Sequence, residues 1–126
     1  MDPGARRAIA YIAGRICTGS DAAGVLDLET GEHAEFEGRM DDEIALYDHS
    51  RHCLVGGQLP ELFDGGTHAS INLEFSDDSF SGFDHASNHY FGGRTVAYGE
   101  DAHEVWIFDC DEECRSSYVL ADPAET

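Results

Sequence analysis

The sequence repeats one short unit five times, and this repeat limits the fold more than any other feature. Each copy is an apolar residue followed by Asp, a turn of three to five residues, and then His, with Cys in its place in the last copy. The five dipeptides are Leu26-Asp27, Tyr47-Asp48, Phe63-Asp64, Phe83-Asp84 and Phe108-Asp109, and the residues after the turns are His33, His52, His68, His89 and Cys114. Because the copies are irregularly spaced, the pattern indicates a series of hairpins rather than a solenoid.

The residue types in the repeat suit β-hairpins. A carboxylate at the end of a strand accepts hydrogen bonds from the backbone ahead of it, and Gly, Ser and Asn tolerate the positive φ angles of turns. Loops of three to five residues are common hairpin lengths. The flanking segments alternate, most clearly in 68–75, where Ala69, Ile71, Leu73 and Phe75 share one face. These features predict paired antiparallel strands.

Ten strands in five hairpins follow from this interpretation. Their predicted ranges are 24–28 and 33–38, 43–48 and 52–56, 61–64 and 68–75, 79–84 and 89–98, and 104–109 and 114–120. Every Asp turn then follows an odd-numbered strand, so all the Asp turns lie at one end of the sheet. A sheet with one apolar face must cover that face, and rolling up also removes its edges. We therefore predict an all-β antiparallel up-and-down meander rolled into a barrel, with a two-sheet β-sandwich as the alternative.

The chain length fits one domain with a real core. We expect a single all-β domain over residues 1–126, with frayed ends at 1–6 and 121–126.

Residues 7–16 are ambiguous because two periodicities overlap in them. The competing patterns are a helical stripe of Ile9, Ile12 and Ile16 and a strand face of Ile9, Tyr11 and Ala13. Gly14 and the Tyr and Ile content favour a strand.

Negative charge dominates the composition. The chain has 26 acidic residues and 7 basic residues, all of them Arg, for a net charge of -19. Such a surface repels nucleic acid and anionic membranes. Because the acidic residues occur all along the chain, they are typical of a solvated acidic surface, as in a halophilic protein or one from a GC-rich genome. The alternatives are a face for a cationic partner and a mimic of nucleic acid that inhibits a basic protein.

The apolar run near the N-terminus ends at Arg15 and is too short and too interrupted for a membrane span or a signal peptide. We therefore expect a cytoplasmic protein whose cysteines are mostly reduced. Cys110 and Cys114 flank a three-residue turn, so they could face each other across a hairpin and form a disulfide under oxidising conditions.

Asp, His and Cys are metal-ligand types, and the repeats place them near one another in sequence. The candidate ligands are Asp48, His52, Asp84, His89, Cys110 and Cys114. A metal site needs three or four ligands that converge on one point, whereas repeats around a barrel rim diverge. We therefore expect no metal and no cofactor, with each Asp capping its own turn and each His pairing across the strands.

Catalytic signatures are missing from the sequence. It has no Gly-x-Ser-x-Gly elbow and no phosphate loop. His52 and Cys53 are adjacent, so in a strand their side chains point to opposite faces, which does not suit nucleophilic catalysis. A small-molecule-binding barrel or a hydrolase would need an open cavity and is the alternative.

These observations together predict a non-enzymatic, acidic binding or interaction module. Its partner would be a cationic protein or a second copy of the chain, and neither nucleic acid nor a membrane. Large aromatic residues dominate interface energetics, so the candidate anchors are Tyr47, Phe63, Phe83, Tyr90 and Phe91, with the barrel core as their alternative location.

A longer pattern, aromatic-Asp-turn-His-aromatic-Gly, runs through the repeats. It is carried by Val25-Leu26-Asp27, Leu46-Tyr47-Asp48, Ser81-Gly82-Phe83-Asp84 with His89-Tyr90-Phe91-Gly92, Ile107-Phe108-Asp109, and Tyr11-Ile12-Ala13-Gly14 near the start. This pattern resembles that of an uncharacterised family of small bacterial all-β proteins found in mobile gene cassettes. The resemblance covers about residues 9–120 and implies a fold type but no activity, so it carries over no catalytic residue. The Cys residues of the last copy depart from the pattern and put a repeated role for His in doubt.

Overall fold

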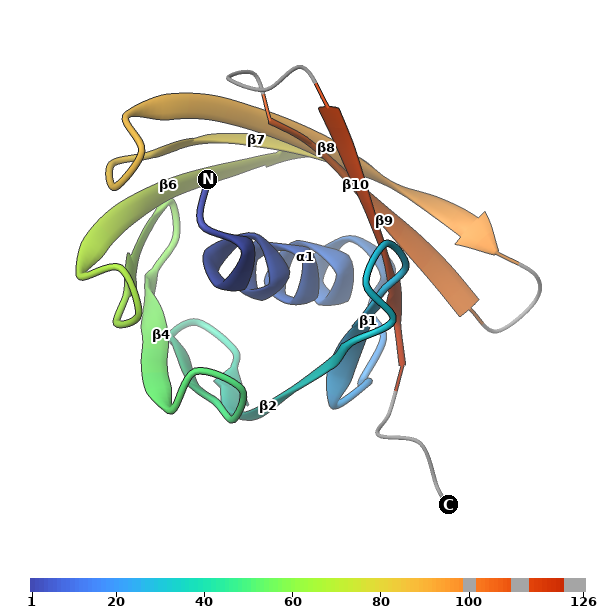
Figure 1. Cartoon of the computed structure of the whole chain (residues 1–126), viewed down its shortest axis with the longest axis horizontal. Helices are drawn as coiled ribbons and strands as arrows, with labels where there is room; N and C mark the ends of the chain where they lie inside the picture. The colour runs from blue at the N-terminus through green and yellow to red at the C-terminus, as the bar shows by residue number, and fades with distance from the viewer. Residues whose placement is uncertain (99–101, 110–113, 122–126) are drawn as a thin grey trace.

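The computed structural model describes residues 1–98, 102–109 and 114–121 of the chain (Figure 1). It contains one helix, α1 (Pro3–Thr18), followed by ten strands. The strands are β1 (Gly24–Asp27), β2 (His33–Met40), β3 (Ile44–Asp48), β4 (Cys53–Gln58), β5 (Glu61–Asp64), β6 (Ala69–Ser76), β7 (Ser79–Asp84), β8 (His89–Tyr98), β9 (Ala102–Asp109) and β10 (Cys114–Leu120). Among the described residues no helix is both long enough and apolar enough to cross a membrane.

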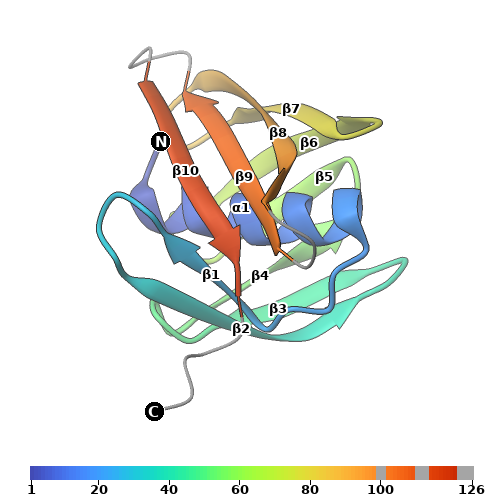
Figure 2. The same cartoon turned by 90° about the vertical axis from the view of Figure 1, so that its right-hand side faces the viewer.

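The strands form a closed antiparallel barrel (Figures 1 and 2). Each strand pairs with its neighbours in the sequence, and β1 closes the barrel by pairing with β10, with Val25 opposite Leu120 and Asp27 opposite Tyr118. The predicted up-and-down barrel is therefore confirmed, and the sandwich alternative is excluded because the strands make one continuous sheet.

Helix α1 runs through the inside of the barrel (Figure 1). It is buried on all sides, through Gly4, Ala5, Ala8, Ile9, Ala10, Tyr11, Ile12, Ala13 and Gly14. Small residues let the wall close around it, since a Cβ at Gly14 would lie only 2.8 Å from Cγ2 of Val105. The ring of Tyr11 stacks on Phe36 with centroids 4.6 Å apart, and its hydroxyl donates to the carbonyl of Ala22. The helix therefore supplies the centre of the hydrophobic core.

Local signals determine both ends of α1. Asp2 is the N-cap and accepts a hydrogen bond from the Ala5 N–H at 3.1 Å, and Pro3 occupies the first helical position. Gly19 ends the helix with a φ of 73°, a left-handed conformation that costs glycine little.

Two expectations about the chain ends are corrected by this helix. The prediction of a strand over 7–16 is wrong, because that segment lies within α1. The expectation that 1–6 are frayed is also wrong, since the helix begins at Pro3 and the amine of Met1 lies 2.9 Å from Oδ2 of Asp109. Of the predicted frayed tail 121–126, Ala121 is held in place, since its N–H donates to the carbonyl of Gly24 at 3.0 Å, and 122–126 lie outside the described residues.

The hairpin turns share a constant backbone geometry. In the four turns that the structure describes after Asp27, Asp48, Asp64 and Asp84, the residue four positions beyond the Asp has a positive φ. These residues are Gly31 (75°), His52 (54°), His68 (56°) and Asn88 (66°). The repeated position therefore requires a left-handed backbone rather than a histidine, and His33 and His89 simply open the return strand in the copies where Gly or Asn takes this place.

In the four described turns the Asp caps its own turn, as predicted, and the turn after Asp109 lies outside the described residues. The backbone N–H two residues ahead donates to the carboxylate of Asp27 at 2.9 Å, of Asp48 at 3.0 Å and of Asp84 at 3.1 Å. Because these residues end odd-numbered strands of one antiparallel barrel, their turns lie at one end of it, which we call the Asp end. The five carboxylates, including those of Asp64 and Asp109, are all buried.

Candidate functional site

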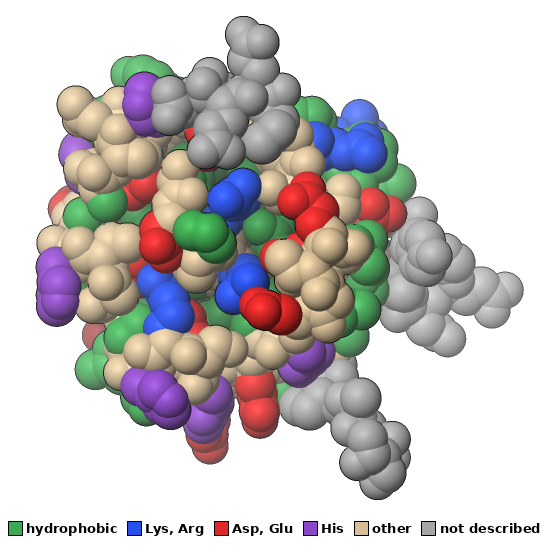
Figure 3. Space-filling model, in the orientation of Figure 1, with side chains coloured by type: hydrophobic (Ala, Val, Ile, Leu, Met, Phe, Trp, Pro, Cys, Tyr) green, Lys and Arg blue, Asp and Glu red, His purple; other side chains and the backbone are tan. Residues whose placement is uncertain are grey.

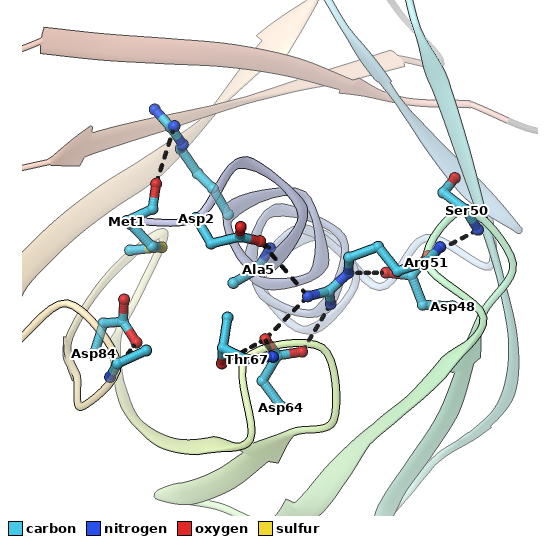
Figure 4. A network of polar contacts seen from close by, with 11 residues as sticks. Met1, Asp2, Ala5, Asp48, Ser50, Arg51, Asp64, Thr67 and Asp84 are labelled. Atoms are coloured by element: carbon cyan, nitrogen blue, oxygen red, sulfur yellow. Dashed lines mark hydrogen bonds and ion pairs between the residues drawn. The ribbon is translucent and has the colours of Figure 1, made fainter.

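Arg51 lies at the centre of an ion-pair network at the Asp end (Figure 4). Its Nε donates to Oδ2 of Asp48 at 2.7 Å, and its two terminal nitrogens donate to the two carboxylate oxygens of Asp64 at 3.0 and 2.7 Å. The N-cap residue of α1, Asp2, has a carboxylate oxygen 3.8 Å from the same guanidinium. The network therefore joins two hairpin turns to the start of the helix.

Opposed charges keep this network ionised. Burial raises the pKa of the Asp64 carboxyl, but the hydrogen bonds and charge of Arg51, with the Thr67 hydroxyl, outweigh burial and hold that pKa below its usual value. Burial likewise lowers the pKa of the Arg51 guanidinium, and the carboxylates of Asp64 and Asp48 outweigh that effect and raise it. All three groups are satisfied by one another, which is the arrangement of a structural ion pair.

Two further positive groups pair with buried carboxylates at the Asp end. The amine of Met1 pairs with buried Asp109, and Nε of Arg7 lies 3.5 Å from Oδ2 of Asp27. Figure 3, which views the molecule along the same direction as Figure 1, shows basic side chains near the middle of this face with acidic ones beside them. The buried carboxylates thus hold α1 in place and cap turns, a structural role.

The structure does not bring the described metal candidates together. Asp48 and Asp84 are buried, whereas His52 is exposed and its Nδ1 lies 3.3 Å from the Tyr47 hydroxyl; His89 is half-buried. Among the described residues no group of three or more His, Cys, Asp or Glu side chains could hold a metal ion. Strand register sets Asp84 opposite His89 on β7 and β8, whereas Asp48 lies opposite Cys53 and His52 lies in the turn before β4.

Two cysteines are described as free thiols. Burial raises the pKa of Cys17 and of Cys53, so little of either is thiolate at neutral pH. Cys110 and the side chain of Cys114 lie outside the described residues, and with them the disulfide that oxidation would allow and the last two metal candidates.

The outer surface of the barrel carries an apolar band near the Asp end. Each residue that precedes a buried Asp points outward because neighbours in a strand alternate. With two residues of the return strands that pair with them, the outer band comprises Leu26, Tyr47, Leu54, Phe63, Phe83, Tyr90 and Phe108. Leu54 and Tyr90 are the most open, at 69% and 68% exposed. Of the five aromatic residues predicted as anchors, only Phe91 is buried in the core.

A shallow trough of about 360 Å³ lies on the outer band over β6, β7 and β8. Its lining residues are Asn72, Glu74, Ser81, Gly82, Phe83, Tyr90 and Phe91. Strand pairing sets Asn72, Phe83 and Tyr90 in one row and Glu74, Ser81 and Gly92 in the next. Space opens beside the rings because Ser81 and Gly92 are small, and the rings of Phe83 and Tyr90 meet edge to face at 4.8 Å.

A second depression lies on β3, β4 and β5, with a volume of about 260 Å³. Ala45, Leu54 and Phe63 are among its lining residues, and the lining contains no charged side chain. The two depressions therefore differ in chemistry, since only the trough has a carboxylate, that of Glu74.

Charge is unevenly distributed along the barrel wall. The segment 52–93 contains no Arg or Lys; of its exposed acidic residues, Glu61 and Glu74 lie on strands β5 and β6, and Asp77 and Asp78 lie in the turn between β6 and β7. We call the outer face of β4 to β8 formed by this segment the acidic wall. Beyond it, Arg94 and Arg115 lie over the ring of Trp106, at 5.8 and 4.4 Å from its centroid.

The uneven charge leads to a prediction about salt. Arg7 and Arg51 pair with buried carboxylates at the Asp end, so they do not neutralise the large excess of carboxylates on the surface. These surface charges repel one another in the folded state, and salt screens the repulsion. We expect the melting temperature to rise by several degrees between about 0.05 M and about 0.5 M sodium chloride, measured by circular dichroism. A melting temperature that does not change with salt would contradict the self-repulsion argument.

Comparisons with known proteins identify no relative. The resemblance to the hairpin-repeat family of gene cassettes therefore stays a prediction, and the function has to rest on this chain's own geometry. No family model matches the chain, and neither a curated protein nor a solved structure matches it.

Proposed function

We propose that this protein is a non-enzymatic binding module that holds a cationic segment of another protein on the acidic wall. The observation that carries this proposal is the combination of exposed carboxylates with exposed Leu54, Phe63 and Tyr90 on a segment without a Lys or Arg. Negative potential attracts a basic partner and speeds its association, while apolar side chains supply the contact area that holds it.

The fold supports binding on the outside rather than the inside. Helix α1 occupies the interior that a small-molecule-binding barrel would use as its cavity. The outer band is carried by paired strands of a closed barrel, so its side chains are held on a rigid surface, which reduces the entropy lost on binding.

Charge also favours a heterologous, cationic partner over the alternatives. A second copy would bring a net charge of -19 against an equal charge, which opposes self-association. A mimic of nucleic acid would need its acidic groups on the surface, whereas Asp64 and Asp84 of this segment are buried. The proposed location is the cytoplasm, where free thiols such as those of Cys17 and Cys53 stay reduced.

A cationic peptide titration tests this function. We expect an octa-arginine peptide to bind and to shift the backbone amide NMR signals of β4 to β8, with an affinity that falls about tenfold between about 0.05 M and about 0.5 M sodium chloride. The matched control is the same peptide with citrulline in place of arginine, which keeps the shape and removes the charge. Absence of saturable binding, or shifts confined to the Asp end, would overturn the proposal.

A further inference from the structure

We infer that the trough on β6, β7 and β8 receives one Arg or Lys side chain of the partner, with its cation over the ring of Tyr90 and facing the carboxylate of Glu74. This inference rests on the proposed function and names the contact that would anchor the cationic segment.

The shape of the trough suits a long cationic side chain. Tyr90 on β8 and Glu74 on β6 lie in adjacent rows and on opposite sides of β7, whose Ser81 lies between Glu74 and Gly92. Neighbouring strands are about 4.8 Å apart, so the trough is about 10 Å wide, which suits a long, thin side chain lying across small residues. The methylene groups of Arg or Lys would pack on the apolar lining while the charged end reaches Glu74.

The ring of Tyr90 is available to a ligand. Its side chain is among the most exposed of the outer band, and no guanidinium lies over it in the described part of the chain. The ring of Phe83 is covered on another side by His85, at 4.8 Å between centroids, and Nε2 of His85 lies 2.7 Å from Oδ1 of Asn72. These contacts hold Phe83 in place as the support for Tyr90.

Among the described residues, the trough combines an aromatic ring with a carboxylate but receives no cation from the chain itself. Elsewhere the chain places its own Arg side chains over aromatic rings, as Arg94 and Arg115 do over Trp106 and Arg15 does over Tyr11. Glu74 forms no ion pair with any described residue, and segment 52–93 supplies no Lys or Arg to pair with it. A cation that lies over an aromatic ring and next to a carboxylate is stabilised electrostatically by both groups.

The test compares octa-arginine affinities of single variants. We expect Tyr90→Phe to bind as the unmodified protein does, because the ring remains, and Tyr90→Leu to bind about three- to fivefold more weakly, because an apolar group of similar size lacks the π face. Glu74→Gln should also weaken binding about threefold. The charge-matched control is Glu35→Gln on β2, and the control for an exposed apolar side chain outside the acidic wall is Leu28→Ala, at 46% exposed in the turn after β1; both should change affinity less than about 1.5-fold.

The outcomes separate this inference from the proposed function. If all variants bind the peptide as tightly as the unmodified protein, the acidic wall binds it diffusely, and the trough assignment is wrong while the proposed function stands. Equal losses of affinity in Tyr90→Leu and Leu28→Ala, or in Glu74→Gln and Glu35→Gln, contradict the assignment in the same way. If the amide NMR signals of the trough residues shift with protein concentration in the absence of peptide, the occupant is a second copy of the chain, and the inference is overturned. Lack of peptide binding by the unmodified protein ends both proposals.

Discussion

Replacing Arg51 by Met should lower the free energy of unfolding by about 3–5 kcal/mol at neutral pH. In the unmodified protein Asp48 and Asp64 are 1% and 0% exposed, and the guanidinium of Arg51 binds both carboxylates. The variant keeps the two carboxylates and removes the guanidinium. Two like charges then remain buried at the end of the barrel without a cation between them. Urea unfolding followed by circular dichroism measures the loss, since urea, unlike guanidinium chloride, does not screen the charges.

The matched control is Arg39→Met, which removes another Arg from an ion pair with Asp. The guanidinium of Arg39 lies 3.1 Å from Asp41, but the two side chains are 65% and 59% exposed. Pairs in water contribute little, so this change should cost less than about 1 kcal/mol. Equal losses in the two variants would show that the Arg51 network adds no stability from its burial.

The stability lost in Arg51→Met should depend on pH in a defined direction. Because the folded protein holds the pKa of Asp64 below its usual value, the network's contribution is complete above the unfolded pKa of about 3.9 and is lost as the pH falls through the folded value. Without Arg51, burial of the Asp64 carboxyl is opposed only by the hydrogen bonds of Thr67 and of the Gly66 N–H, so the carboxyl takes up a proton more easily and its penalty shrinks with falling pH. The difference in free energy of unfolding between the unmodified protein and Arg51→Met should therefore be largest at neutral pH and should decrease towards pH of about 4. A gap that is constant with pH contradicts this account.

The hairpins could be predicted from the sequence because their signals are local. The predicted ranges 61–64, 79–84 and 89–98 coincide with β5, β7 and β8. An apolar residue before Asp marks both the end of a strand and the side chain that points outward. The histidines were harder to interpret, because the feature that repeats is a left-handed backbone four residues after Asp, and different residue types can adopt it.

The ion-pair network could not be predicted, because it depends on contacts that exist only when the barrel has closed. Arg51 reads as an ordinary turn residue, and nothing in its neighbourhood points to Asp64, which is 13 positions away, or to Asp2 at the other end of the network. The trough has the same origin, since its rows combine residues of three strands through their register.

Helix α1 was mistaken for a strand because it has no polar face. A surface helix is recognised by an apolar stripe with a period of 3.6 residues, but this helix is enclosed by the barrel, so nearly every position from Gly4 to Gly14 is buried. Glycine, which weakens helix prediction, is needed at position 14 because a Cβ there would meet the side chains of Val105 and Leu120. The signals that remained were the caps, Asp2 with Pro3 at the start and Gly19 at the end.

The enclosed helix leads to the second large effect, in Ile12→Ala. Ile12 is 0% exposed at the centre of the barrel, and Ile16, one turn later on the same helix, is 40% exposed. Truncating the buried side chain should cost about 2–5 kcal/mol, because the closed wall cannot collapse into the cavity, whereas Ile16→Ala should cost less than about 1 kcal/mol. Since small domains are stable by about 5–15 kcal/mol, Ile12→Ala should lower the urea midpoint markedly. Because α1 is the core against which the sheet closes, the helical and sheet signals in circular dichroism should disappear in one transition. A variant that loses its helix while the barrel signal persists, or equal effects at the two positions, would show that the barrel does not depend on its central helix.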